Sequence, residues 1–237
     1  MIFFYTLLII GLTILIHEAG HLAAARMMSI PVKTFSVGFG PRLIGFTHNG
    51  TDYRLSLIPL GGYIEPLLTT EEEFYAIPAY RRVFFALGGV LFNVIFAILM
   101  LSAYQILGRD LPVLSALLMG IRKTLSLAAL IAASIPTLFT SGSELTGIIG
   151  IVRESGAFIG VNYLQMFNFA GILSLNLAVF NLLPLPVLDG GKVLLYAVER
   201  ILPSIRKISM GLSIAGWIVI LGLTVLATAN DILRWVA

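Results

Sequence analysis

The stretch from Ile2 to Met28 reads IFFYTLLIIGLTILIHEAGHLAAARMM, and it decides what kind of fold the chain can adopt. It is apolar enough and long enough to cross a lipid bilayer, which takes about 20 residues of α-helix. The polar cluster HEAGH interrupts it at residues 17–21. No basic residue precedes the run, and it is long for the core of a secretory signal. We therefore interpret it as a retained transmembrane helix.

The composition extends this interpretation to the whole chain. The 237 residues are 58% hydrophobic and only 11% charged, whereas soluble domains carry about 25% charged residues. A soluble globular domain is excluded because too few charges are present to cover a water-facing surface. The net charge of +3 reflects basic residues kept on the cytoplasmic side of a membrane rather than binding to nucleic acid. Because the chain has no cysteine, a transition metal would need histidine and carboxylate ligands.

The fold class that we predict is a polytopic α-helical membrane protein with four core transmembrane helices. A small β-sheet follows the first span, because the residues there alternate around an Asn-Gly hairpin signal at 49–50. The apolar segment between the second and third spans carries Arg122 and Lys123 near its middle. Such charges are costly at bilayer depth, so we expect an interfacial or partly inserted helix. The predicted spans are 2–28, 83–107, 163–183 and 208–229, with a β-region at 31–66, an interfacial helix at 111–139 and one domain over 1–237.

The distribution of basic residues predicts the orientation in the membrane. Ten of the 15 lysines and arginines lie in two loops, at 26–82 and 192–207. Loops rich in basic residues stay in the cytoplasm. We therefore expect an inner-membrane, multi-pass protein with both termini outside the cytoplasm.

The HEAGH cluster carries the chemistry of a metal-dependent hydrolase. His17 and His21 are four residues apart, so they lie on one helical face and can hold one metal ion. Glu18 can act as general base on a metal-bound water. The alternative is a buried, hydrogen-bonded histidine pair without metal. Inside a membrane span such residues are costly unless they are paired or bound to something, which favours the metal.

A catalytic zinc site needs a third protein ligand. Asp189 follows two prolines and precedes two glycines in NLLPLPVLDGG, residues 181–191. Prolines break a helix, and broken helices at membrane depth are tolerated where they line a cavity. Alone, Asp189 could simply cap the next helix. His48 lies in the hairpin turn and is expected to be exposed, and the acidic residues 71–73 are expected in a solvated loop or helix start.

These motifs resemble the site-2 protease family of intramembrane zinc metalloproteases, and within it the regulator-of-sigma-E type (RseP/RasP-like) branch. Three further motifs match the pattern of this family in the same order along the chain: FSVGFG at 35–40, IPLGGY at 58–63, and Gly88-Gly89 with Asn93. Members of that branch usually carry one or two PDZ domains between the second and third spans. The interval 108–162 is too short for one, so the chain is either naturally shorter there or has lost the domain, and an adaptor could replace it.

The resemblance implies roles for particular residues. His17, His21 and Asp189 would be zinc ligands, Glu18 would activate the water, and Asn181 would bind the substrate backbone. Gly61 and Gly62 match a β-loop near the active site. For Asn93 the sequence leaves two readings open, a substrate contact and a hydrogen bond between helices.

The implied function is that of a zinc-dependent intramembrane endopeptidase, with its active site in the cytoplasmic half of the bilayer. Its partners would be transmembrane protein or peptide substrates, such as anti-sigma factors or signal-peptide remnants, and the lipid bilayer, with no nucleic acid. The alternative is a membrane zinc or ion transporter using the same histidines. Transporters often show repeated halves, and this sequence shows no repeat. A catalytically dead scaffold is disfavoured because all four catalytic positions are filled.

Overall fold

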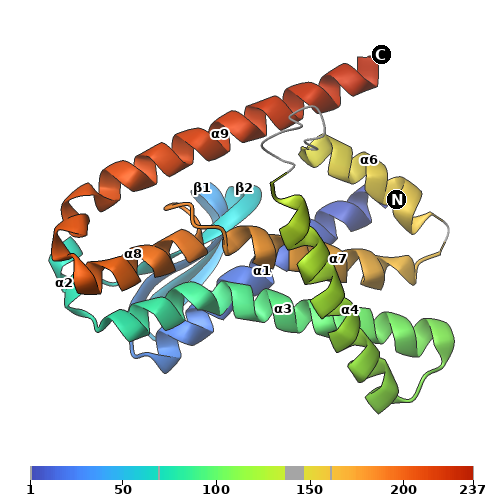
Figure 1. The fold of residues 1–237 in the computed structure, drawn as a ribbon, viewed down its shortest axis with the longest axis horizontal. Coiled ribbons are helices and arrows are strands. Elements are labelled where there is room, and N and C mark those ends of the chain that lie inside the picture. The colour runs from blue at the N-terminus through green and yellow to red at the C-terminus, as the bar shows by residue number, and fades with distance from the viewer. Residues whose placement is uncertain (1, 69, 137–146, 161, 237) are drawn as a thin grey trace. The chain divides into compact units, whose positions relative to one another are not determined.

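A computed structural model describes residues 2–68, 70–136, 147–160 and 162–236 (Figure 1). The described residues are mostly helical, with one antiparallel pair of strands. The elements in chain order are α1 (Ile2–Met27), β1 (Val32–His48), β2 (Thr51–Pro66), α2 (Glu71–Ala76), α3 (Ala79–Arg109), α4 (Val113–Ser134), α6 (Ile148–Ile159), α7 (Gln165–Asn181), α8 (Asp189–Ile201) and α9 (Arg206–Val236), with a short 3₁₀ turn at Pro203–Ile205.

Four helical segments among the described residues are long and apolar enough to cross a membrane. They are Phe3–Met27, Ala79–Arg109, Val113–Ser134 and Pro203–Arg234. The helical membrane fold is thereby confirmed, and α1, α3 and α9 match predicted spans. The predicted third span is α7, which has only 17 residues, or about 26 Å of helix. The predicted interfacial segment contains α4, an unbroken helix of 22 residues, so its interfacial position stays a prediction.

The two charges of α4 have different environments. The Lys123 ammonium donates a hydrogen bond to Asn168 Oδ1 at 2.8 Å and lies 5.4 Å from the ring centroid of Tyr104. Arg122, its neighbour, is exposed. A lysine in an apolar helix is tolerated when polar groups of neighbouring helices surround it, and α7 and α3 supply those groups here.

The sheet confirms the predicted β-region. Asn49 and Gly50 have φ values of 49° and 78°, the left-handed pair that a tight Asn-Gly hairpin turn requires. Both strands bend, so Phe35 in the first half of β1 pairs with Tyr53 on one side and Ile64 on the other. The first half of β1 is therefore the centre of the sheet, and the last residues of β2 form one edge.

The chain forms two compact units, each assembled from segments that are distant in sequence. One contains residues 1–10, 94–179 and 210–237, and the other contains 11–93 and 180–209. The predicted single domain over 1–237 stays a prediction. Every candidate site residue falls in the second unit, which contains most of α1, the sheet, the first half of α3 and all of α8.

Within that second unit, α1 and α3 cross with their backbones in contact. A Cβ at Gly20 would collide with the carbonyl of Gly88, and a Cβ at Gly88 would collide with the backbone of Gly20. Two facing glycines allow two helices to approach this closely. The approach sets the HEAGH face of α1 directly against α3.

The interval predicted to be too short for a PDZ domain is helical where it is described. Between residues 108 and 162, the described residues 108–136 and 147–160 contain the end of α3, all of α4 and α6, and no strand. Helix α6 was not predicted. The described part of the interval is therefore consistent with the predicted lack of a PDZ domain.

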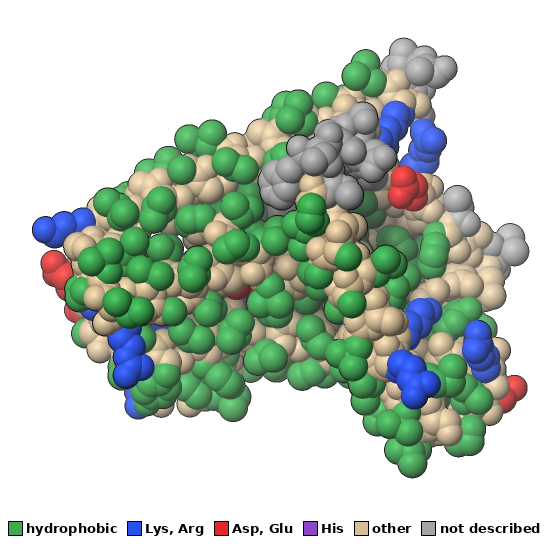
Figure 2. Space-filling view, viewed as in Figure 1, with side chains coloured by type: hydrophobic (Ala, Val, Ile, Leu, Met, Phe, Trp, Pro, Cys, Tyr) green, Lys and Arg blue, Asp and Glu red, His purple; other side chains and the backbone are tan. Residues whose placement is uncertain are grey.

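Hydrophobic side chains cover much of the face shown in Figure 2, and charged ones gather at a few places. Large apolar residues are exposed on several long helices, among them Phe4 on α1, Leu118 on α4 and Ile218 on α9. Extensive exposed apolar surface is unfavourable in water and is expected of a surface that faces lipid.

Candidate metal centre

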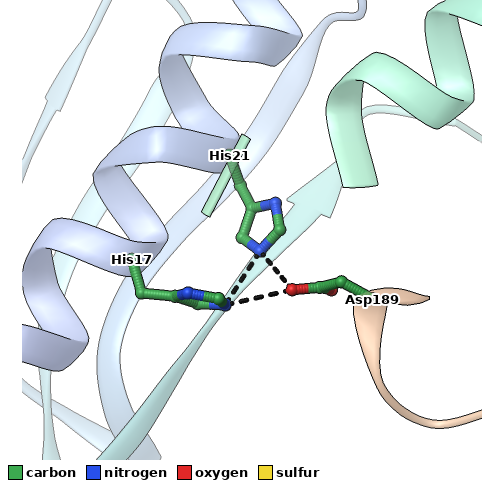
Figure 3. Close-up of side chains that lie close together, drawn as sticks. All are labelled: His17, His21 and Asp189. Atoms are coloured by element: carbon green, nitrogen blue, oxygen red, sulfur yellow. Dashed lines mark hydrogen bonds and ion pairs between the residues drawn. The ribbon is translucent and has the colours of Figure 1, made fainter. Parts of the chain in front are cut away.

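Three side chains from two distant parts of the sequence converge on one point (Figure 3). The Nε2 atoms of His17 and His21, both on α1, lie 3.2 Å apart. Asp189 Oδ2 lies 3.1 Å from the first and 3.2 Å from the second. All three residues are buried, with exposed fractions of 7%, 8% and 4%. The structure thus brings together the three residues that the sequence analysis proposed as ligands.

The triangle fits a zinc ion. Zinc bonds to histidine nitrogen and carboxylate oxygen are about 2.0–2.1 Å long, so ligand atoms of a tetrahedral site lie about 3.3 Å apart. The observed sides of 3.1 to 3.2 Å are close to this value. Asp189 Oδ2 is buried and faces the Nε2 atoms of both histidines, which suits an oxygen that shares a cation with them. Three protein ligands leave the fourth position for water, the arrangement of catalytic zinc sites.

The other ring nitrogen of each histidine contacts α3. His21 Nδ1 lies 2.9 Å from the carbonyl oxygen of Phe85. His17 Nδ1 lies 3.2 Å from the side-chain nitrogen Nδ2 of Asn93. Both rings are therefore held at Nδ1 while Nε2 points to the shared site.

Gly89 makes room for the metal between the two rings. A Cβ at this position would lie 2.6 Å from His17 Cε1, 2.6 Å from His21 Nε2 and 2.7 Å from His17 Nε2. Real Cβ contacts are not this short, so only glycine fits here. The Gly88-Gly89 pair thus has two separate functions: close helix contact at Gly88 and clearance over the ligand nitrogens at Gly89.

Asp189 reaches the site because α7 ends early and the chain folds back. Helix α7 ends at Asn181, and α8 begins at Asp189 itself. Side chains at Gly190 and Gly191 would collide with the backbones of Leu182 and Leu185, so the pair of glycines lets the connecting loop pack on the start of α8. The helix N-terminus also stabilises the carboxylate. Asp189 is the first helical residue rather than the side-chain cap.

Lys192 contacts the second oxygen of the same carboxylate. Its Nζ lies 3.2 Å from Asp189 Oδ1, one turn further along α8. The aspartate is thus fixed at both oxygens, with Oδ2 directed at the histidines. The lysine was not singled out in the sequence, although its i, i+3 spacing from Asp189 is visible there.

Glu18 is buried beside the ligands, with 8% of its surface exposed. Its carboxylate interacts electrostatically with both histidines, with Asp189 and with Lys192. A Cβ at Gly62 would lie 2.6 Å from Glu18 Cγ, so β2 passes directly against this side chain. One carboxylate beside a three-ligand site and close to a strand is the arrangement in which a base, a metal-bound water and an extended peptide could meet.

The remaining candidates divide into residues near the site and residues outside it. Gly62 contacts Glu18, whereas Gly61 lies against the ring of Phe39. Asn181 is half-buried at the end of α7, and His48 is exposed at the hairpin turn as predicted. The contacts of the Phe85 carbonyl could not be found from sequence, because a main-chain oxygen carries no residue-type signal.

Comparison with known proteins agrees with this site. Residues 5–223 match the sequence profile of peptidase family M50. A Thermotoga maritima protein named "Putative zinc metalloprotease" is 36% identical over 105 residues, which are 40% of this chain and 21% of the relative. "Putative zinc metalloprotease FN1322" of Fusobacterium nucleatum is 22% identical over 98% of each chain. "Putative zinc metalloprotease slr1821" of Synechocystis sp. is 23% identical over 95% of this chain and 93% of the relative.

The class defined by fold and site is that of membrane zinc metalloproteases: long apolar helices and a buried His-His-Asp group, with zinc as the metal. The chain belongs to peptidase family M50, the site-2 protease family. The resemblance seen in the sequence is thereby confirmed. Some matches cover only part of the relatives, such as the 21% of the Thermotoga maritima protein.

Proposed function

We propose that this protein is a zinc-dependent endopeptidase that cleaves peptide bonds within or near transmembrane segments of other membrane proteins. The observation that carries the proposal is the position of the ligand pair. His17 and His21 belong to a helix that is itself long and apolar enough to span a bilayer, and they meet Asp189 in a buried cluster. A hydrolytic centre built into such a helix is accessible to peptide bonds that lie in the membrane.

Metal binding and proton transfer are assigned to different residues of the site. His17, His21 and Asp189 would hold the zinc, which would supply a Lewis acid and lower the pKa of a water molecule at the site. Glu18 takes a proton from the attacking water and returns it to the amine that leaves when the peptide bond breaks. Burial of these groups excludes bulk water and strengthens their electrostatic interactions.

Substrate binding uses the strand beside the base. A peptide bond inside a helix is shielded, because its backbone groups are already hydrogen-bonded. An unwound segment can satisfy those groups by adding to a sheet edge. The last residues of β2 form such an edge, and β2 touches Glu18 at Gly62. We assign Gly61, Gly62 and Asn181 to binding of the substrate backbone.

The proposed location is the inner membrane, with the zinc site in its cytoplasmic half. His17 and His21 lie about 24–30 Å along a helix that enters from outside, and the basic loops stay in the cytoplasm. Transmembrane proteins or peptides, such as anti-sigma factors or signal-peptide remnants, would be the substrates. An adaptor protein could take the part of a PDZ domain in selecting them.

The test is cleavage of a labelled single-span peptide in lipid vesicles, with and without a zinc chelator. Cleavage should stop with the chelator and return with zinc. His17→Ala and Asp189→Ala should lose zinc, whereas Glu18→Gln should keep it and lose cleavage. Full zinc occupancy in the first two variants would contradict the ligand assignment. Zinc flux across the vesicles without any cleavage would favour a transporter.

A further inference from the structure

Asn93 lies fully buried beside a proposed zinc ligand. Its side chain is fully buried in α3, with 0% of its surface exposed. The amide nitrogen, Nδ2, lies 3.2 Å from His17 Nδ1. The opposite nitrogen of that ring, Nε2, is the one that faces Asp189 and His21. A contact with substrate, one of the two readings left open by the sequence, would require this buried amide to be uncovered.

The chemistry of the ring decides what the amide must do when zinc is bound. Coordination uses the lone pair of Nε2, so the ring hydrogen is then on Nδ1. A buried N–H needs an acceptor, and metal-bound histidines nearly always donate this hydrogen to a carboxylate, a carbonyl or water. Either end of the Asn93 amide can occupy the position beside Nδ1, because a half-turn about the last side-chain bond exchanges them.

The second histidine shows the same arrangement with a different acceptor. His21 Nδ1 lies 2.9 Å from the Phe85 carbonyl oxygen, eight residues before Asn93 on the same helix. A main-chain oxygen can only accept, so it fixes the hydrogen of His21 on Nδ1. Helix α3 thus places a backbone carbonyl beside one zinc-binding ring and a side-chain amide beside the other, and a half-turn of that amide would present its oxygen to the ring.

We infer that Asn93 is a positioning residue for the metal centre: its Oδ1 accepts the Nδ1–H of His17 and keeps Nε2 directed at zinc. The inference rests on the proposed zinc site, but it does not depend on the protein being a protease. It assigns Asn93 to the outer shell of the metal, not to the substrate. An acceptor at this position restricts ring rotation and makes Nε2 a better ligand.

The test is the zinc affinity of purified protein in detergent, measured by competition with a chromogenic chelator. Asn93→Leu keeps the approximate volume but removes the acceptor, and it should weaken zinc binding by about 10- to 100-fold. Asn93→Asp keeps an oxygen acceptor, and it should bind zinc within a few-fold of the wild type. Gln105→Leu is the matched control, since it removes another buried amide from α3, and it should leave zinc affinity unchanged.

The zinc affinities of these variants distinguish a role of Asn93 in orienting His17 from a role in packing alone. Wild-type zinc affinity in Asn93→Leu would overturn the inference. Equal weakening in Asn93→Asp and Asn93→Leu would also overturn it, because only shape would then matter. If the leucine variant does not fold, Asn93→Ala removes the acceptor without adding bulk, and the same comparison with aspartate applies. Zinc affinity is measured without substrate. If Asn93→Leu binds zinc more weakly and the wild-type protein cleaves no peptide, the positioning role is supported and only the protease proposal is refuted.

Discussion

At the scale of single residues, the metal site depends as much on an absent side chain as on the ligands. Gly89 leaves space between the two histidine rings, and a Cβ there would lie 2.6 Å from His21 Nε2. A methyl group would therefore occupy the position in which the ligand nitrogens face the metal. The ligands can be recognised from their spacing in the sequence, but the need for glycine at this position appears only when α3 is placed against α1.

We predict that Gly89→Ala abolishes high-affinity zinc binding. The expected loss is at least about tenfold in affinity, the lower bound seen when an outer-shell partner of a metal ligand is removed. The measurement is zinc content per chain by atomic absorption after dialysis against a weak chelator. Gly11→Ala on α1 is the control, because nothing lies within 4 Å of a Cβ there. One zinc per chain in both variants would show that the rings can move aside.

At the scale of elements, a buried cluster of charges joins α3, α8 and the start of α9. Arg82 Nη1 lies 2.6 Å from Glu199 Oε2, and Arg206 Nε donates to Glu199 Oε1 at 2.7 Å. The Arg82 guanidinium also lies 4.8 Å from the ring centroid of Tyr196 and 5.1 Å from that of Tyr75. Because Asp189 begins the helix that Glu199 helps to anchor, this cluster holds the third zinc ligand against the helix that faces the other two.

Breaking this cluster should destabilise the protein strongly. Removing one partner of a buried ion pair costs about 3–5 kcal/mol, because the other charge stays buried without compensation. We predict a loss of that size for Arg82→Met in unfolding measurements in detergent. Lys33→Met is the control, because its pair with Glu65 is exposed and such pairs contribute at most about 1 kcal/mol. Similar losses in both variants would contradict the central position given to Arg82.

The same cluster predicts a pH dependence of stability. Burial raises the pKa of the Glu199 carboxyl, but the hydrogen bonds from Arg82 and Arg206 lower it more, so the pKa in the folded protein lies below its usual value. A carboxyl with a depressed pKa contributes stability above the unfolded-state value of about 4.3, and this contribution is lost as the pH falls through the folded-state value. Wild-type stability should therefore fall below about pH 4. Glu199→Gln should be less stable at pH 7, and its free energy of unfolding should decrease less steeply as the pH is lowered. The same steepness in the variant and the wild type would argue against a depressed pKa of Glu199.

At the scale of the whole molecule, the sequence was sufficient for the motifs and for most of the helices. The i, i+4 histidines, the Asn-Gly turn and the first, second and fourth apolar runs are local patterns, and each appears in the structure where it was predicted. The third run is the helix α7, which has only 17 residues. Helix α6 was not predicted, because its 12 residues are too few for a span signal. The Arg82–Glu199 pair is 117 residues apart in sequence, and no local pattern indicates which charges will meet across such a separation.

The orientation of the helices in the membrane is the prediction that depends most on residues far apart in the sequence. For Asp189 to reach the zinc, α1 and α7 must both run inward from outside, so the ends of α3 and α7 that face the interval must lie on one side. We predict that single cysteines at Gly108 and Asn162 both react with an impermeant thiol reagent added from outside the cytoplasm. The native chain has no cysteine, so it is its own negative control. Reaction from opposite sides would mean that an odd number of crossings separates α3 from α7.

Cleavage within the membrane is tested most directly by locating the peptide bond that is cut. A single-span peptide is incubated in lipid vesicles with zinc-loaded wild-type protein, and the fragments are identified by mass spectrometry, with Glu18→Gln as the matched variant. We predict new ends inside or next to the apolar stretch for the wild type, and none for Glu18→Gln with zinc still bound. Cleavage confined to the water-exposed flanks, or equal cleavage by Glu18→Gln, would contradict this prediction.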